Sequence, residues 1–333
     1  MKKVVFVVCA FLVVAAGCDR EPCAVCGDEA SLRRISFDLS GGAPAVKSAR
    51  GTSDDERFVS SCALYVFSRA GELLQKLSSS DGRFDFYLTD ETYDFVAIAN
   101  KTELPENPRT RHELLATATS LAENGPGRFV MVGELREHRI EGDEKITVEA
   151  VRLAAKLSCT IRTAFSGPLA SRPFSVESVY LTNVAGSNDL ALSVPVGDDP
   201  AGWYNRMDLD PGTAAPLSTL LACAPARAMA PSDSLTPQQA FYAYPNESSD
   251  SHDKSKWGSR CTRLVVKATL GGRTTYYPVT LPSVRRNRHY HVELEISNFG
   301  VDHPEDNPED GCEMEATVRV GAWEPGDSLE GNY

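Results

Sequence analysis

The sequence predicts an all-β protein made of two β-sandwich domains. Apolar and polar residues alternate through many short segments, which places one face of each segment on a core and the other in water. Clusters of Gly, Pro, Asn and Asp separate these segments, and such punctuation between short strands is typical of sandwiches and barrels. Segments with a helical period are scarce. Together these observations favour antiparallel sheets.

The predicted strands start at residues 32–39 and recur almost to the end of the chain. Five segments alternate most clearly, at 34–39, 83–88, 156–161, 176–181 and 291–296. Two segments have a helical pattern instead. Residues 112–123 place four apolar side chains on one face, and residues 217–223 form a weaker candidate.

A domain boundary is predicted near 165–168, where Phe165 is followed by Ser166, Gly167 and Pro168. Strand patterns run up to this point from residue 146 and start again at 174. A chain of 333 residues is long enough for two cores of ordinary size. We therefore expect an N-terminal sandwich over 32–165 and a C-terminal sandwich over 166–333.

The N-terminus has the layout of a bacterial lipoprotein signal. Two lysines precede a short apolar run that is too brief to span a membrane comfortably, and this run ends in the sequence VVAAGCDR. Small residues directly before Cys18 resemble a lipobox, so residues 1–17 are predicted to be removed and Cys18 to be lipidated. A plainly cleaved signal or an uncut anchor is the alternative. Residues 18–31 would then form a tether.

The charge of the chain argues against nucleic acid as a partner. The formal net charge is -12, and without residues 1–17 there are 32 basic residues against 46 acidic ones. An acidic surface repels both phosphate backbones and anionic lipid. Attachment to a membrane would therefore depend on the lipid at Cys18.

Seven cysteines follow Cys18, and they show no regular disulfide framework. Cys23 and Cys26 have the spacing of a zinc or redox pair. A zinc site needs two further ligands, however, and a redox pair normally opens a helix after a strand. A local disulfide between Cys23 and Cys26, or free thiols, is the simpler interpretation.

Other candidate sites have simple structural explanations. His289 and His291 share one face of a strand, as metal ligands do, but the spacing supplies no third ligand, so they are expected on the solvent face of an edge strand. The acidic residues 302–310 are rich in calcium-type oxygen ligands but lack the spacing of an EF-hand, so a solvated loop is expected. The aromatic residues in 203–204 and 242–244 could stack on a sugar, but such residues more often close the end of a sandwich.

No motif for catalysis or for a cofactor is present. The sequence has no Gly-x-Ser-x-Gly elbow, no phosphate-binding loop and no His-Glu-x-x-His pair. No catalytic residue, metal site or cofactor is therefore predicted. A hydrolase whose site is assembled from distant loops stays open as an alternative.

Six segments in a fixed order resemble the fimbrillins of Bacteroidales type V pili, including their lipidated anchor subunits. These segments are 63–73 (ALYVFSRAGEL), 93–100 (YDFVAIAN), 129–133 (FVMVG), 151–157 (VRLAAKL), 286–292 (RNRHYHV) and 318–323 (VRVGAW). Each is mostly a strand pattern, but the ordered set after a lipobox is more specific. The resemblance extends from about residue 32 to residue 323.

The resemblance implies two tandem transthyretin-like Greek-key β-sandwich domains with few short helices. It also implies a pilus subunit that supports cell adhesion, has other fimbrial subunits as partners and joins them by donor-strand exchange. An anchor would stay on the outer membrane through the lipid on Cys18. A stalk or tip subunit would lose its lipid and first strand, 32–39, to an arginine-specific protease, and Arg50 in the loop 40–55 is the candidate cleavage site. The tether with Cys23 favours the anchor, and a glycan-binding surface lipoprotein is a further alternative.

Overall fold

The structure is a computed structural model of the chain, and it describes residues 31–40, 56–193, 199–206, 217–249, 259–306 and 314–323. Strands make up most of this part of the chain, and its helices are short. Leu32–Tyr333 forms one compact unit. The prediction of an all-β fold is confirmed. Among the described residues no helix is long and apolar enough to cross a membrane.

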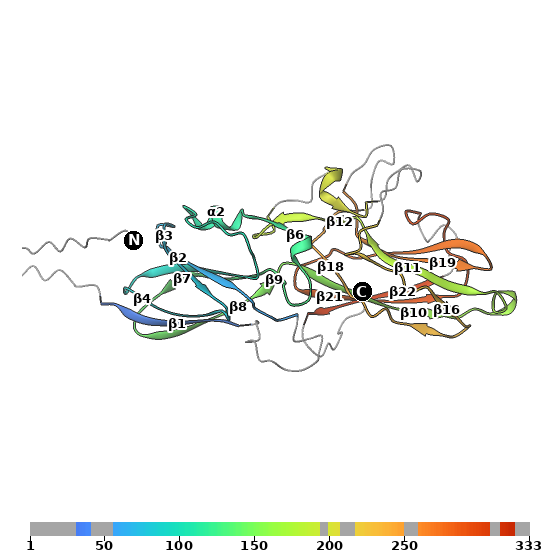
Figure 1. Ribbon diagram of the computed structural model, residues 1–333, viewed down its shortest axis with the longest axis horizontal. Helices are drawn as coiled ribbons and strands as arrows, with labels where there is room; N and C mark the ends of the chain where they lie inside the picture. Colours follow the sequence, from blue (N-terminus) through green and yellow to red (C-terminus); the bar gives the residue numbers. More distant parts are fainter. Residues whose placement is uncertain are drawn as a thin grey trace, which may run out of the picture. The chain divides into compact units, whose positions relative to one another are not determined.

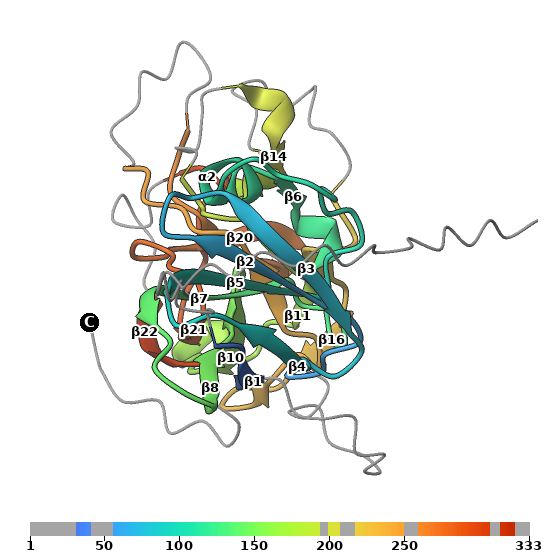
Figure 2. The same ribbon diagram turned by 90° about the vertical axis from the view of Figure 1, so that its left-hand side faces the viewer.

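Two sheets enclose the first hydrophobic core. The smaller has the order β4-β1-β8 and the larger the order β3-β2-β5-β7-β9, and Figures 1 and 2 show them as facing layers. Their strands are β1 (Arg33–Ser40), β2 (Cys62–Ser68), β3 (Leu73–Ser79), β4 (Arg83–Leu88), β5 (Thr92–Ala99), β7 (Met131–Arg139), β8 (Glu144–Glu149) and β9 (Val151–Arg152). Alternate residues of both sheets fill the space between them, as the period of two requires.

Two further sheets line most of the second and larger core, which also includes side chains from β2, β5, β7 and α2. One has the order β17-β10-β21-β22 with β18 also on β10, and the other has the order β15-β11-β19-β20 with β16 also on β11. Their strands are β10 (Ala155–Thr163), β11 (Phe174–Thr182), β15 (Ala222–Cys223), β16 (Arg227–Met229), β17 (Ser234–Leu235), β18 (Phe241–Ala243), β19 (Arg263–Leu270), β20 (Arg273–Thr280), β21 (Arg288–Ile296) and β22 (Met314–Ala322).

The short elements occur in the chain between strands of these sheets. Two small sheets pair β12 with β14 and β13 with β6. The elements are α2 (Arg111–Leu115), β6 (Ala118–Ser120), η1 (Leu121–Glu123), η2 (Gly167–Leu169), β12 (Val184–Ala185), β13 (Ser187–Asp189), η3 (Pro200–Gly202) and β14 (Trp203–Tyr204).

Both helix predictions need correction. The helix expected over 112–123 is only the five-residue α2, because Ala118–Ser120 is drawn into a strand by pairing with Ser187–Asp189. The weaker helix expected over 217–223 is wrong, since Ala222–Cys223 pairs with β11 as strand β15. In both places a partner distant in sequence overrides the local apolar pattern.

The expected boundary near residue 165 coincides with a break between strands. β10 ends at Thr163 and β11 starts at Phe174, with the 3₁₀ turn η2 between them. β10 nevertheless pairs in parallel with β21 from Lys156 to Thr163, so the second core takes a strand from the N-terminal side of the break. The division into domains 32–165 and 166–333 stays a prediction.

Candidate functional site

Strand β1 is the candidate site, because it is the middle strand of its sheet. Residues Arg33 to Asp38 pair antiparallel with β4, and residues Ile35 to Ser40 pair in parallel with β8. Both edges of β1 are therefore used along almost its full length. Its removal would leave unpaired backbone donors and acceptors on two neighbouring strands at once.

The inner face of β1 is fully buried. Ile35, Phe37 and Leu39 are at most 2% exposed. The ring of Phe37 packs against Phe84 with centroids 6.1 Å apart and against Phe95 at 5.8 Å. Burial of three large apolar side chains stabilises the sheet by roughly 1.5–3 kcal/mol for each. Ile35, Phe37 and Leu39 form an apolar strip that anchors β1 on the core.

Two glycines make room for Leu39 at the end of the strip. A Cβ on Gly133 of β7 would lie 2.8 Å from Leu39 Cδ1 and 2.9 Å from the carbonyl oxygen of Glu149. A Cβ on Gly82 would lie 3.2 Å from Leu39 Cβ, and Gly82 has a φ of +78° that favours glycine. The backbone NH of Leu39 also donates to the carbonyl oxygen of Gly82 at 3.0 Å.

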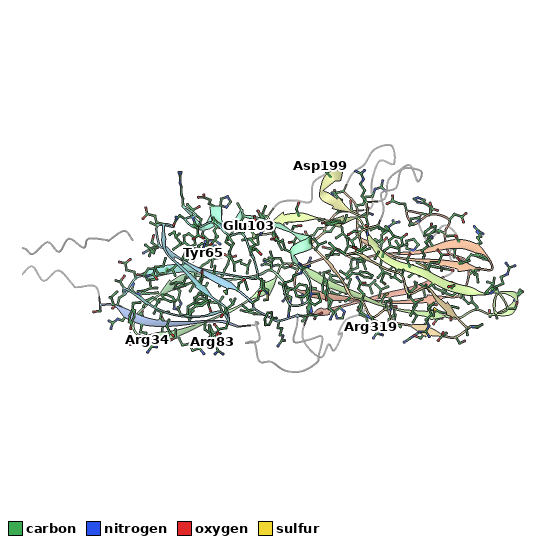
Figure 3. All side chains as sticks on the ribbon, viewed as in Figure 1. Arg34, Tyr65, Arg83, Glu103, Asp199 and Arg319 are labelled. Atoms are coloured by element: carbon green, nitrogen blue, oxygen red, sulfur yellow. The ribbon has the colours of Figure 1, made fainter. Side chains whose placement is uncertain are left out.

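The outer face of β1 carries polar contacts. Ser36 donates to Asp85 at 2.7 Å, and at the start of the strand, on the same side as Ile35, Arg33 donates two hydrogen bonds to Asp90 at 2.6 and 2.8 Å. These hydrogen bonds lower the pKa values of both carboxyl groups, while the Asp90 carboxylate raises the pKa of Arg33. Figure 3 shows Arg34 on this outward side, where its side chain is 61% exposed. Exposed pairs add little stability, so the inner strip and the two ladders hold the strand.

Glu56 is the first described residue after β1, and its carboxylate is a hub of contacts. It accepts hydrogen bonds from Trp323 Nε1 at 2.7 Å and from the Tyr242 hydroxyl at 3.1 Å, and it lies 3.0 Å from Lys156 Nζ. Burial and this carboxylate raise the pKa of Tyr242. Arg152 donates to the Glu56 carbonyl oxygen at 2.9 Å, and its guanidinium lies 4.5 Å from the Trp323 ring centroid.

The Glu56 hub joins four distant parts of the chain. Glu56 is only 7% exposed, so its charge needs the partners that surround it. The rings of Tyr242 and Trp323 stack 5.6 Å apart, and Phe129 meets both edge-on. Sequence reasoning missed this hub, because each of these partners lies at least 96 residues from Glu56 and the members share no common motif.

The predicted processing residues lie outside the described part of the chain. This holds for Cys18, Cys23, Cys26 and Arg50. Lipidation, the local disulfide and cleavage therefore stay predictions. The described cysteines Cys62, Cys159 and Cys223 are free, and burial raises the pKa values of Cys62 and Cys159 to about 12.

The expectation that His289 and His291 lie on an edge strand is wrong. Their strand, β21, is in the middle of its sheet. β21 lies between β10 and β22, and His289 is 6% exposed. The Ser158 hydroxyl lies 2.8 Å from His289 Nε2 and 2.8 Å from His291 Nδ1. Desolvation lowers the pKa of His291. Across the described ranges, no three His, Cys, Asp or Glu side chains gather as a metal site.

The acidic loop is bound by arginines over its described part, 301–306. Glu305 pairs with Arg260, and Asp302 pairs with Arg273. Glu305 is largely buried, which raises its pKa. The loop expected to be solvated is therefore tied to the protein surface at two points. Residues 307–310 lie outside the described residues.

The aromatic residues do not form an open platform. Trp203 is 8% exposed and Tyr244 is fully buried, and Tyr244 bonds to Thr119 and Asn124 through its hydroxyl. The Tyr242 ring has one face against Trp323. These side chains pack in the protein, as the simpler interpretation expected.

Comparison with solved structures shows which proteins share this arrangement. A fimbrillin from Porphyromonas gingivalis superimposes with a TM-score of 0.62 at 14% identity, over 88% of this chain and 98% of that one. The chain has the fold of a fimbrillin. A protein assigned to cell adhesion from Bacteroides eggerthii matches with a TM-score of 0.61 at 18% identity, over 87% of this chain and 96% of that one. The tip fimbrial protein Mfa3 from P. gingivalis matches at 0.51 and 13% identity, over 88% and 100%.

This chain shares its fold with the fimbrillins although its sequence is not closely similar to theirs. No protein-family model matches the chain, and no curated protein matches it either. The fold therefore supports the resemblance that was drawn from six strand segments, and the superposition covers 88% of this chain.

Proposed function

We propose that this protein is a structural subunit of a surface pilus that supports cell adhesion, and that it is a lipidated anchor or assembly subunit. Its fimbrillin fold supports the proposal, together with the likeness to a tip fimbrial protein. The observation that carries it is the central place of β1 between β4 and β8. A short strand in this place can be supplied by the chain itself or by a neighbour.

The backbone pairing and the buried side chains of β1 explain how such subunits would join. Without β1, the facing edges of β4 and β8 would be unpaired, and the socket of Phe37 beside Phe84 and Phe95 would be open to water. A strand from another subunit would restore both ladders and refill the apolar strip. In an anchor subunit β1 stays in its own sheet, and the sheet is already complete.

The anchor assignment depends on Cys18. A lipid at this position would hold the base of the pilus at the outer membrane, with the protein on the outer surface. Asp19 follows the cysteine directly, and in some bacteria this position sorts lipoproteins to the inner membrane. The outer membrane is our assignment because a pilus base must face the cell surface.

A stalk or tip subunit is the alternative within the same class. Cleavage after Arg50 by an arginine-specific protease would separate β1, together with the lipid, from Glu56 and all that follows. The open groove would then accept a neighbour's strand. Both versions use the same groove, so they differ in what happens at Cys18 and Arg50.

A Cys18→Ser variant tests the anchor. We expect it to lose labelled palmitate and to release fibres into the medium, while the same cells with the wild-type chain retain them. Labelling that is unchanged in the variant would refute the lipid at Cys18. Fibres that stay on the cells despite lost labelling would refute the anchor role and favour the stalk or tip.

A further inference from the structure

A pocket of about 520 Å³ opens beside the Glu56 hub, and neither assembly nor anchoring explains it. Its volume lies in the range of small-molecule sites, which is about 300–1,000 Å³. The buried end is formed by Glu56, Lys156, Ser158, Tyr242 and His289, and the rim carries Arg128, Gln238 and Gln239. The residues come from several segments that only the fold brings together.

The polar side chains at the buried end of the pocket are connected to one another and to their neighbours. Lys156 is held by the Glu56 carboxylate, and Ser158 lies between His289 and His291 at 2.8 Å from each. The charges of Lys156 and Glu56 offset each other. This end therefore offers a fixed polar surface without a net charge.

Arg128 supplies the charge that the buried end lacks. It is exposed on the rim, and its guanidinium has no hydrogen-bond or ion-pair partner among the residues that the structure describes. The chain as a whole is acidic, with a formal net charge of -12. An unpaired guanidinium beside a concave surface is suited to bind a carboxylate with two parallel hydrogen bonds.

The remaining rim combines neutral polar groups with apolar ones. The exposed amides of Gln238 and Gln239 can each donate and accept, and so can the Thr219 hydroxyl. Leu121 and Leu220 line the same pocket. A pyranose ring has hydroxyls on its edge and C–H groups on its faces. The amides and the Thr219 hydroxyl can hydrogen-bond to such hydroxyls, and the leucine side chains can pack against the C–H groups.

We propose that this pocket binds an acidic saccharide, with Arg128 on the carboxylate and the two glutamines on ring hydroxyls. An acidic peptide shares the carboxylate, but the paired amides and the volume of about 520 Å³ favour a sugar of one or two rings. This binding does not depend on the role of the protein in a pilus. It requires only the fold that places residues 128, 156–158, 238–239 and 289 around one cavity.

Isothermal titration of the mature chain with methyl β-D-glucuronide and methyl β-D-glucoside tests the proposal, because these sugars differ only at the carboxylate. We expect the glucuronide to bind at least tenfold more tightly. Arg128→Gln should remove this difference. Arg69→Gln, at an exposed position in the turn after β2 and away from the pocket, should leave it unchanged.

Three results would overturn the proposal. The first is absence of binding for both sugars, and the second is equal affinity of the wild-type chain for both. The third is tighter binding of an acetylated Asp-Glu-Asp-Glu peptide than of the glucuronide, which would assign the pocket to acidic peptides. Since Arg128 is exposed and unpaired in the described structure, its substitution should not disturb folding, and circular dichroism of the variant checks this.

Discussion

The side chain of Leu39 in β1 occupies the space that a Cβ on Gly133 of β7 would need. Leu39 Cδ1 lies 2.8 Å from that position, and Val148 Cγ1 of β8 lies 3.0 Å from it. β1 and β7 belong to opposite layers of the first core. The absence of a side chain at Gly133 therefore lets the two layers meet where the apolar strip of β1 ends.

Gly133→Ala should destabilise the protein. The new methyl group would collide with Leu39 and with the carbonyl oxygen of Glu149, and overpacking of this kind typically costs about 1–3 kcal/mol. Urea unfolding measures the loss. Gly142→Ala is the matched control, because a Cβ there meets nothing within 4 Å. Equal unfolding midpoints for both variants would contradict this close packing.

Phe37→Ala should remove the main apolar anchor of β1. Phe37 is 1% exposed, and truncation of a buried phenylalanine costs about 3–5 kcal/mol. Arg34→Ala on the outer face should cost less than about 1 kcal/mol, since exposed ion pairs contribute little. If the two variants lose similar free energy of unfolding, β1 is not anchored by its inner face.

Glu56→Gln should weaken the hub that joins Lys156, Tyr242 and Trp323. The substitution leaves Lys156 without its partner in a mostly buried place, and such a loss costs about 3 kcal/mol. Adding Lys156→Met should recover most of the loss, because no unpaired charge is left. Glu72→Gln, on an exposed residue, should have no measurable effect. A double variant as unstable as the single one would show that the ion pair is not the cause.

His291 should make the free energy of unfolding fall with acid. Burial lowers the pKa of His291 in the folded protein below its ordinary value of 6.5, although Glu293 nearby opposes the shift. The unfolded chain therefore takes up the proton first, so this contribution is present above pH 6.5 and is lost as the pH falls through the folded pKa. His291→Gln should flatten the stability curve between pH 7 and pH 5. If the variant keeps the same dependence of unfolding free energy on pH, titratable groups other than His291 determine that dependence.

The alternation of apolar and polar residues along the sequence was sufficient to predict many of the strands. Strict alternation located β1 and β4. These features depend on neighbouring residues, so a sequence contains them directly. The groove around β1 was expected only through the family resemblance.

Contacts between distant residues could not be predicted in the same way. The parallel pairing of β1 with β8 joins residues more than 100 positions apart, and the same is true of Glu56 with Trp323. His289 was expected on an edge because β22, which covers that side of β21, could not be placed by pattern alone. The prediction of a helix over 112–123 was wrong for the same reason, since β13, which is distant in sequence, pairs with residues 118–120.

The central claim is that this protein is a pilus subunit that keeps its own strand β1 and its lipid. Mass spectrometry of the N-terminal peptide of the chain, taken from surface fibres sheared from cells, tests this claim most directly. We expect the chain to be present in the fibres with an acylated Cys18 as its first residue and β1 still attached. A mature chain that begins at Gly51, or fibres without the chain, would contradict the account.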